Sequence, residues 1–379
     1  MTSTKCVQTL LVTGILLLPA AAQTPPPAPA PADPAPAAPP AWSAGSIDFS
    51  GLIDGYYSLN FNHPASRTNV LRNFDVRANS FSLNMAKLTM EHGPDPVGFR
   101  VDLGFGRAFD IFHATEPFKD GTGIMRHIMQ AYVSLKPEKA GGFQFDFGKF
   151  VTSAGAELTE THLNWNYSRA YLFANGPYYH FGARMSKPIT SYWTAGFQVL
   201  NGWNNVEDNN SAKTFGFTSA LNSKKVSLLN NYYVGNEKPT GEKGVRHFID
   251  SVLLLNPHEK ASFYINYDYG VDKTPKALGS NNCWYGLGVA GHFVANDWFS
   301  VSPRYEVYND INGFITLQRQ RLQEFTLTGE LKMKKGFLTR LEYRRDWSNQ
   351  PFFDRGNEPG GAKAQSTILV GMVVYFGPK

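Results

Sequence analysis

Residues 47–60 read IDFSGLIDGYYSLN, and apolar and polar side chains alternate along this stretch. Successive side chains of a β-strand point to opposite faces, so every second residue shares one environment. One face therefore carries isoleucine, phenylalanine, tyrosine and leucine with two glycines, while the other carries mainly aspartate, serine and asparagine. A strand of this kind suits a boundary between an apolar and an aqueous phase.

The same alternation recurs along the chain, with strands expected to begin near residues 46, 80, 98, 127, 143, 178, 192, 213, 225, 246, 262, 283, 298, 320, 337 and 365. Short turns such as 92–96, 295–297 and 334–336 alternate with long polar loops. We therefore predict an all-β fold: a transmembrane antiparallel up-and-down β-barrel of about sixteen strands, with short periplasmic turns and long extracellular loops. Closing the barrel leaves no edge strand unpaired in lipid.

Two places interrupt the strand pattern. In the second strand, the apolar series Phe81, Leu83 and Met85 continues as Leu88 and Met90, and this change of phase predicts a β-bulge. Pro303 falls in the middle of a strand that has neighbours on both sides, where its missing N–H removes a ladder bond. We expect a bulge there as well.

Composition supports a barrel over other classes. Charged residues make up 18% of the 379 residues and aromatic residues 14%, and after residue 45 no apolar run approaches the length of a membrane helix. The formal net charge of +5 is dispersed, which argues against nucleic acid as a partner. A soluble propeller or sandwich also has many short strands, but it needs neither an export signal nor alternating long and short connections.

The N-terminal region predicts export. Lys5, an apolar segment at 10–18 and alanines at 20–22 have the pattern of a signal peptide, assigned to residues 1–22. A Pro/Ala-rich periplasmic linker follows at 23–45, and the barrel occupies 46–379. The single cysteine beyond the signal peptide, Cys283, excludes a disulfide framework within the chain.

Motifs for catalysis or cofactor binding are weak. Residues 286–291 (GLGVAG) match the dinucleotide fingerprint, but they lie within a strand pattern and no helix follows. Glu157, Glu160 and His162 lack a recognised metal-ligand spacing. We therefore expect no enzyme activity, no cofactor and no metal, with an outer-membrane enzyme such as a lipase as the least favoured alternative.

Three segments carry a family resemblance: FDFGKFVTSAGAE at 145–157, NWNYSR at 164–169 and PYYHFG at 177–182. Together they resemble the OmpL-like putative β-barrel porin family, with a likeness that spans about residues 46–376. The resemblance implies a bacterial outer-membrane porin. The expected partners are outer-membrane lipids and small hydrophilic solutes or ions, and a homotrimer is the candidate assembly by analogy only.

The strand parity places many charged side chains inside the barrel, and such a density of charge is sustainable in a watery lumen. These predicted lumen-facing residues are Arg100, Asp102, His180, Arg184, Glu306, Glu330, Lys332 and Glu342. We therefore predict a water-filled channel for passive diffusion of small hydrophilic solutes or ions. The alternative is a plugged barrel that serves as a scaffold or adhesin.

The longest connection, 151–177, is too long for a simple hairpin and is predicted to fold into the barrel as a constriction. It contributes Glu157, Glu160, His162 and Arg169, and the opposing wall contributes Arg304, Arg340 and Arg344. Acidic and basic groups that face each other would filter solutes by size and charge. The alternative for this loop is a cap or a trimer latch outside the pore.

Overall fold

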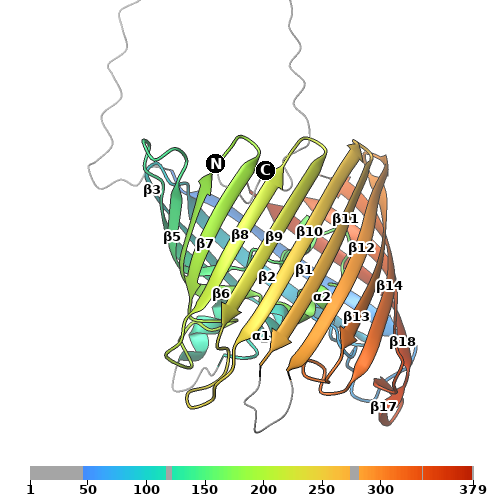
Figure 1. The fold of residues 1–379 in the computed structure, drawn as a ribbon. Helices are drawn as coiled ribbons and strands as arrows, with labels where there is room; N and C mark the ends of the chain where they lie inside the picture. Colours follow the sequence, from blue (N-terminus) through green and yellow to red (C-terminus); the bar gives the residue numbers. More distant parts are fainter. Residues whose placement is uncertain (1–45, 117–121, 274–280, 335, 378–379) are drawn as a thin grey trace, which may run out of the picture.

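The computed structural model describes residues 46–116, 122–273, 281–334 and 336–377. Within them, sixteen antiparallel strands close into one barrel (Figure 1), as the sequence predicted. The barrel strands are β1 (Asp48–Asn60), β2 (Ser80–His92), β3 (Val97–Phe105), β4 (Ile128–Leu135), β5 (Gln144–Val151), β6 (Tyr179–Pro188), β7 (Trp193–Leu200), β8 (Thr214–Asn222), β9 (Val226–Gly235), β10 (Arg246–His258), β11 (Ala261–Asp272), β12 (Asn282–Asn296), β13 (Phe299–Asp310), β14 (Gln320–Lys334), β15 (Phe337–Ser348) and β18 (Ala364–Phe376).

Each of these strands begins within two residues of its predicted start. The barrel closes where β1 pairs with β18, in a register that runs from Gly51 opposite Phe376 to Asn60 opposite Thr367. The predicted signal peptide and linker lie outside the described residues.

Short elements occupy the connections between barrel strands. They are the helices α1 (Arg107–Phe112) and α2 (Tyr171–Asn175), the 3₁₀ turns η2 (Thr122–His127) and η3 (Thr161–Leu163), and the hairpin of β16 (Phe353–Arg355) with β17 (Glu358–Ala362). None of the helices in the described part of the chain is long and apolar enough to cross a membrane.

The two ends of the barrel differ in their connections. One end carries the short turns and both ends of the barrel chain, and we call it the turn end (top of Figure 1). The other end carries the long connections, such as 61–79 and 152–178, and we call it the loop end. This asymmetry is typical of outer-membrane barrels, whose long loops face outward from the cell.

Side chains alternate between the two faces of the wall as the period of two requires. On β14, for example, Phe325 and Leu327 are exposed on the outside, while Thr326 and Thr328 are buried inside. The apolar residues therefore face the position of the lipid, and the polar residues face the lumen.

The predicted bulge in β2 is confirmed, because Asp54 pairs with Met85 and Gly55 pairs with Leu83, which leaves Asn84 without a partner on β1. The predicted bulge at Pro303 is wrong, because β13 keeps an unbroken register with β14 through this position. On the β12 side, paired residues stop at Ala290 and resume at Phe293 in the same register. The missing N–H of proline is accommodated by this gap in the ladder, so no extra residue is needed.

Candidate functional site

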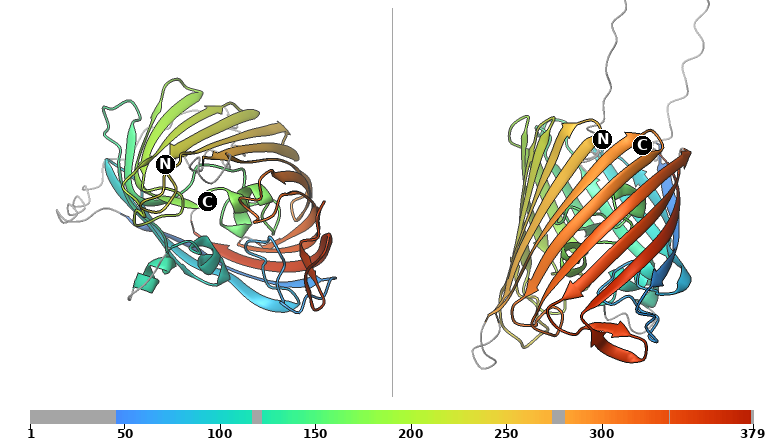
Figure 2. Two further views of the ribbon diagram at one scale, coloured as in Figure 1. Left: turned by 60° about the horizontal axis from the view of Figure 1, so that its bottom comes forward. Right: turned by 90° about the vertical axis from the view of Figure 1, so that its right-hand side faces the viewer.

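The connection between β5 and β6, residues 152–178, lies inside the barrel, and we call it the inner loop. Figure 2 (left) shows its green helix α2 within the ring of strands. Its side chains and backbone contact β9, β11, β13, β14, β15 and β1, so it spans much of the lumen. The prediction that this segment folds inward is therefore confirmed by its position.

The lumen faces of β13, β14 and β15 form a dense set of charges, which we call the charged wall. Every second residue of β15 faces the lumen, and the inward residues alternate in sign from Arg340 to Asp346. The charged wall consists of Arg304, Glu306, Glu324, Glu330, Arg340, Glu342, Arg344 and Asp346, and all eight are buried. Buried charges at this density must pair with each other or with polar backbone groups.

The three arginines of the charged wall bind the inner loop directly. Arg304 pairs with Glu157 and donates to the carbonyl of Ser168 at 2.7 Å. Arg340 donates to the carbonyls of Thr161 (2.7 Å) and Asn166 (3.0 Å) and also to that of Asn164. In addition, the Nη1 of Arg344 donates to the carbonyl of Arg169 at 2.6 Å.

Each of these arginines also keeps a carboxylate partner on the wall itself. Arg304 pairs with Glu324 at 2.8 Å, and Arg340 pairs with Glu330 at 2.6 Å. Arg344 pairs with Asp346 at 2.8 Å. Each of the three arginines is therefore paired with a carboxylate of the charged wall in addition to its contacts with the inner loop.

Carboxylates of the wall accept backbone N–H groups from the same loop. Glu342 accepts from the N–H of Tyr167 (2.6 Å) and of Ser168 (3.0 Å). Glu306 accepts from the first two N–H groups of α2, at Tyr171 and at Leu172 (2.7 Å). An irregular segment inside a protein must satisfy its backbone polar groups. Glu306 and Glu342 of the charged wall satisfy these N–H groups and thereby hold the loop against β13–β15.

On its other side the inner loop reaches β1 and β2. Asp54 of β1 accepts hydrogen bonds from the hydroxyls of Tyr167, at 2.6 Å, and Thr161. Lys87 of β2 pairs with Glu160 of the loop and, at 3.0 Å, with Asp102 of β3. Glu160 therefore binds a wall residue of the same barrel and does not stand free in the lumen.

The remaining predicted residues have structural partners. Arg169 is buried and donates to loop carbonyls at Leu158 (3.0 Å) and Thr159 (2.6 Å). His162 stacks on Tyr375 with ring centroids 4.5 Å apart, and burial lowers the pKa of its imidazole to about 4. His180 faces inward and bonds through Nδ1 to the carbonyl of Gly202 at 2.9 Å.

The arginines that keep contact with water are not those of the charged wall. The side chains of Arg304, Arg340 and Arg344 are 0–1% exposed, whereas those of Arg100 and Arg184 are 19% and 26% exposed. Arg184 pairs with Asp146 at 2.8 Å and lies over the ring of Phe150 at 4.3 Å.

Lys332, another of the predicted lumen residues, is exposed near the turn end of β14 and pairs with Glu330 at 3.4 Å. The sequence placed Arg304, Arg340 and Arg344 across water from the acidic loop, whereas the structure places them in contact with it. Of the predicted lumen residues, Lys332 on β14, Arg100 on β3 and Arg184 on β6 keep contact with water.

Sequence reasoning missed the contribution of the first long loop, 61–79. Arg72 of this loop is buried, pairs with Asp75 and binds Asp346 of the charged wall at 2.7 Å. Phe74 is also buried, with the Arg169 guanidinium 5.1 Å from its ring centre. No strand pattern marks these residues, so only the fold reveals that this loop also enters the lumen.

Features that suggest catalysis have ordinary structural roles. His292 lies 2.9 Å from the hydroxyl of Ser302, but Ser302 is fully buried in the wall and cannot meet a substrate. The fingerprint at 286–291 lies within β12. Among the described residues, no group of three or more His, Cys, Asp and Glu side chains is placed to hold a metal ion.

A closed sixteen-stranded barrel with a loop folded into a charged lumen has the architecture of the outer-membrane porins. A family model described as putative beta-barrel porin-2, OmpL-like, matches residues 46–376, and the chain belongs to this family. The resemblance noted in the sequence is thereby confirmed. The comparison with curated proteins gave no significant match.

Solved structures with a similar fold are outer-membrane channels and porins. OmpT of Vibrio cholerae has a TM-score of 0.59 at 10% identity, covering 88% of this chain and 98% of its own. The anion-selective porin from Comamonas acidovorans has a TM-score of 0.59 at 11% identity, covering 87% and 99%. The channel DcaP of Acinetobacter baumannii has a TM-score of 0.58 at 11% identity, covering 87% and 97%. At these identities the likeness shows the fold alone.

Proposed function

We propose that this porin conducts small hydrophilic solutes or ions by passive diffusion, along a path between the inner loop and the wall formed by β3–β7. The observation that carries the proposal is the contrast in exposure between the two sides of the lumen. The charged wall is sealed by the loop, whereas Arg100 and Arg184 keep contact with water.

Small inward residues on this side also keep contact with water. Gly182 and Ser186 on β6 and Gly196 on β7 are partly exposed at lumen positions, beside Arg184. On the inner loop, Glu160 keeps 13% of its side chain exposed beside Lys87 of β2. In this proposal Glu160 and the two exposed arginines line the narrowest part, and Arg304, Arg340 and Arg344 hold the loop in place.

Further parts of the proposal concern assembly and processing. One of the similar structures is described as a trimer form of OmpT, and a homotrimer is the assembly we propose here. We also propose cleavage of the signal peptide near residue 22 and a periplasmic linker at 23–45. The channel works without covalent chemistry in this account, since diffusion needs no nucleophile, metal or cofactor.

Single-channel recording of the purified protein in a planar bilayer tests this function. Discrete conductance steps are expected, and Arg184→Gln should shift the reversal potential in a KCl gradient toward cation selectivity because it removes a positive charge from the path. Arg321→Gln is the matched control, because Arg321 is exposed on the outer face of β14 and lies outside the lumen. Absence of conductance steps would favour the plugged scaffold, and an equal shift in both variants would exclude the proposed path.

A further inference from the structure

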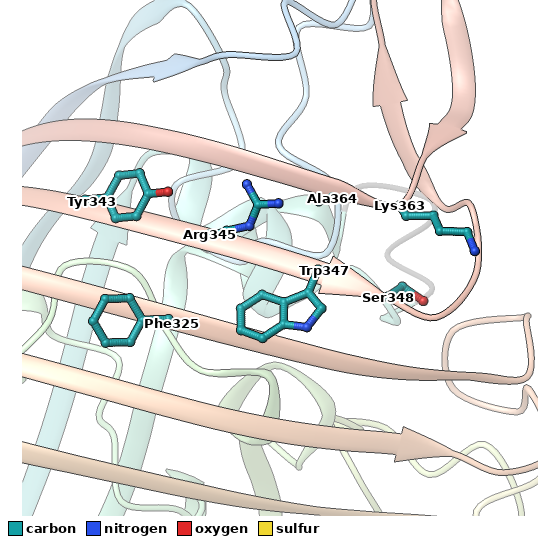
Figure 3. Close-up of a pocket in the computed structure, with 7 residues that line it drawn as sticks. All are labelled: Phe325, Tyr343, Arg345, Trp347, Ser348, Lys363 and Ala364. Carbon is teal, nitrogen blue, oxygen red and sulfur yellow. The ribbon is translucent and has the colours of Figure 1, made fainter.

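An open groove of about 440 Å³ lies on the outer surface of the barrel near the loop end (Figure 3). Its lining consists of Phe325, Tyr343, Arg345, Trp347, Ser348, Lys363 and Ala364. These residues come from neighbouring strands, since Arg345 pairs with Phe325 on β14 and Trp347 pairs with Ala364 on β18. The groove therefore crosses three adjacent strands on the outer face of the barrel.

The cations of this groove differ from those inside the barrel. Arg304, Arg340 and Arg344 all pair with carboxylates, whereas neither Arg345 nor Lys363 has an ion-pair partner among the residues the structure describes. Arg345 donates one hydrogen bond, from Nη1 to the hydroxyl of Ser366 at 3.2 Å. A guanidinium has five N–H donors, so the others remain free for a ligand.

The rest of the groove is apolar and continues into the outer surface of the barrel. Phe325 and Tyr343 are exposed on its floor, and Leu327 and Ile368 are exposed on either side of Tyr343 in the paired strands. Farther toward the turn end, Leu341 is exposed in line with Tyr343. The groove thus presents cations at the loop end and apolar side chains toward the middle of the membrane.

We propose that this groove binds a phosphorylated lipid of the outer leaflet. The phosphate lies between Arg345 and Lys363, and an acyl chain lies along Phe325 and Tyr343. Arginine binds phosphate through charge-assisted hydrogen bonds, and clusters of basic residues at a membrane surface recognise anionic head groups. Aromatic side chains at the same depth match the interface between head groups and acyl chains.

A second copy of the chain fits this groove less well than a lipid. A protein partner would have to supply carboxylates to two cations that lack them, together with a matching apolar surface. A phosphorylated lipid carries an anionic head group and apolar acyl chains in one molecule. Its head group would meet the cations at the loop end, and its acyl chains would meet the apolar side chains toward the middle of the membrane. The proposal concerns the outer surface alone, so it holds whether or not the lumen conducts.

Native mass spectrometry of the full folded barrel in detergent tests the proposal, with bisphosphorylated lipid A and its dephosphorylated form as probes. The wild type should retain the bisphosphorylated probe in preference to the dephosphorylated one. The double variant Arg345→Gln with Lys363→Gln should bind it roughly tenfold or more weakly, because each basic side chain near the surface contributes on the order of 1 kcal/mol. Folding of each variant is checked by the heat-dependent shift of the barrel on gels.

The matched control is Lys224→Gln with Lys225→Gln, which removes two exposed cations from the turn end. This control should bind the bisphosphorylated probe as the wild type does. Equal affinity of the groove variant and the wild type would overturn the proposal, as would equal binding of the dephosphorylated probe to the wild type. If the groove variant instead lost only its oligomeric state, the groove would be a contact between subunits.

Discussion

Replacement of Arg340 by glutamine should detach part of the inner loop from the charged wall. Arg340 is fully buried, pairs with Glu330 at 2.6 Å and donates to three loop carbonyls, at Thr161, Asn164 and Asn166. The variant leaves the buried Glu330 carboxylate with only its longer ion pair, to Lys332 at 3.4 Å. Loss of one member of a buried ion pair costs about 3–5 kcal/mol, which we expect as the decrease in the free energy of unfolding.

Urea titration of the barrel in lipid vesicles, followed by tryptophan fluorescence, measures this cost. The double variant Arg340→Gln with Glu330→Gln should be more stable than Arg340→Gln alone, because it removes the buried carboxylate that has lost its shorter ion pair. Arg321→Gln, on the outer face of the neighbouring strand β14, should cost less than about 1 kcal/mol. A cost below about 1 kcal/mol for Arg340→Gln, or strict additivity in the double variant, would refute the idea that this pair holds the loop.

Three further predictions concern the loop and the orientation of the barrel. Replacing Glu157 and Glu160 together by glutamine should shift ion selectivity toward anions, with most of the shift from the more exposed Glu160, and an unchanged reversal potential would place the loop outside the conduction path. An epitope at Asn357, in the β16–β17 hairpin, should be labelled on intact cells, whereas one at Asp95, in a short turn, should not, and the opposite result would invert the topology. Burial holds the pKa of His162 near 4 against an ordinary 6.5, so the unfolded state binds more protons between these values and stability should fall as the pH drops through this range. Urea titration of His162→Gln should show a smaller fall, and an identical pH profile would show that His162 does not titrate in this way.

Strand positions could be predicted from sequence because the barrel wall separates two solvents along its whole length. Each residue faces either outward or inward, so apolar and polar residues alternate along every strand. The bulge at Asn84 shifts the phase of this alternation by one residue, and the alternation continues on both sides of it. Pro303 misled the prediction because a single sequence does not show which neighbouring ladder contains a gap. The short helices and the β16–β17 hairpin were missed because they are too brief to show a periodicity.

The candidate site was predicted in its parts but not in its contacts. Strand parity placed Arg304, Arg340 and Glu342 inside, and loop length placed 151–177 in the lumen. Glu157 binds Arg304 directly, although the two residues are 147 positions apart in the sequence. This contact depends on the position of the loop inside the barrel, which no local sequence pattern encodes. The same holds for Arg72, whose loop has no strand periodicity and yet pairs with the charged wall.

Access of water to the β6 side of the lumen tests the central claim most directly. Ser186 lies on the lumen face of β6 in line with Arg184, opposite Gln144 of β5, so a cysteine there should line the path. In a Cys283→Ser background, a charged thiol reagent added to open Ser186→Cys channels in a planar bilayer should lower the conductance in discrete steps. A conductance that stays constant after complete modification of the cysteine, confirmed by mass, would contradict a water-filled path between the inner loop and this wall.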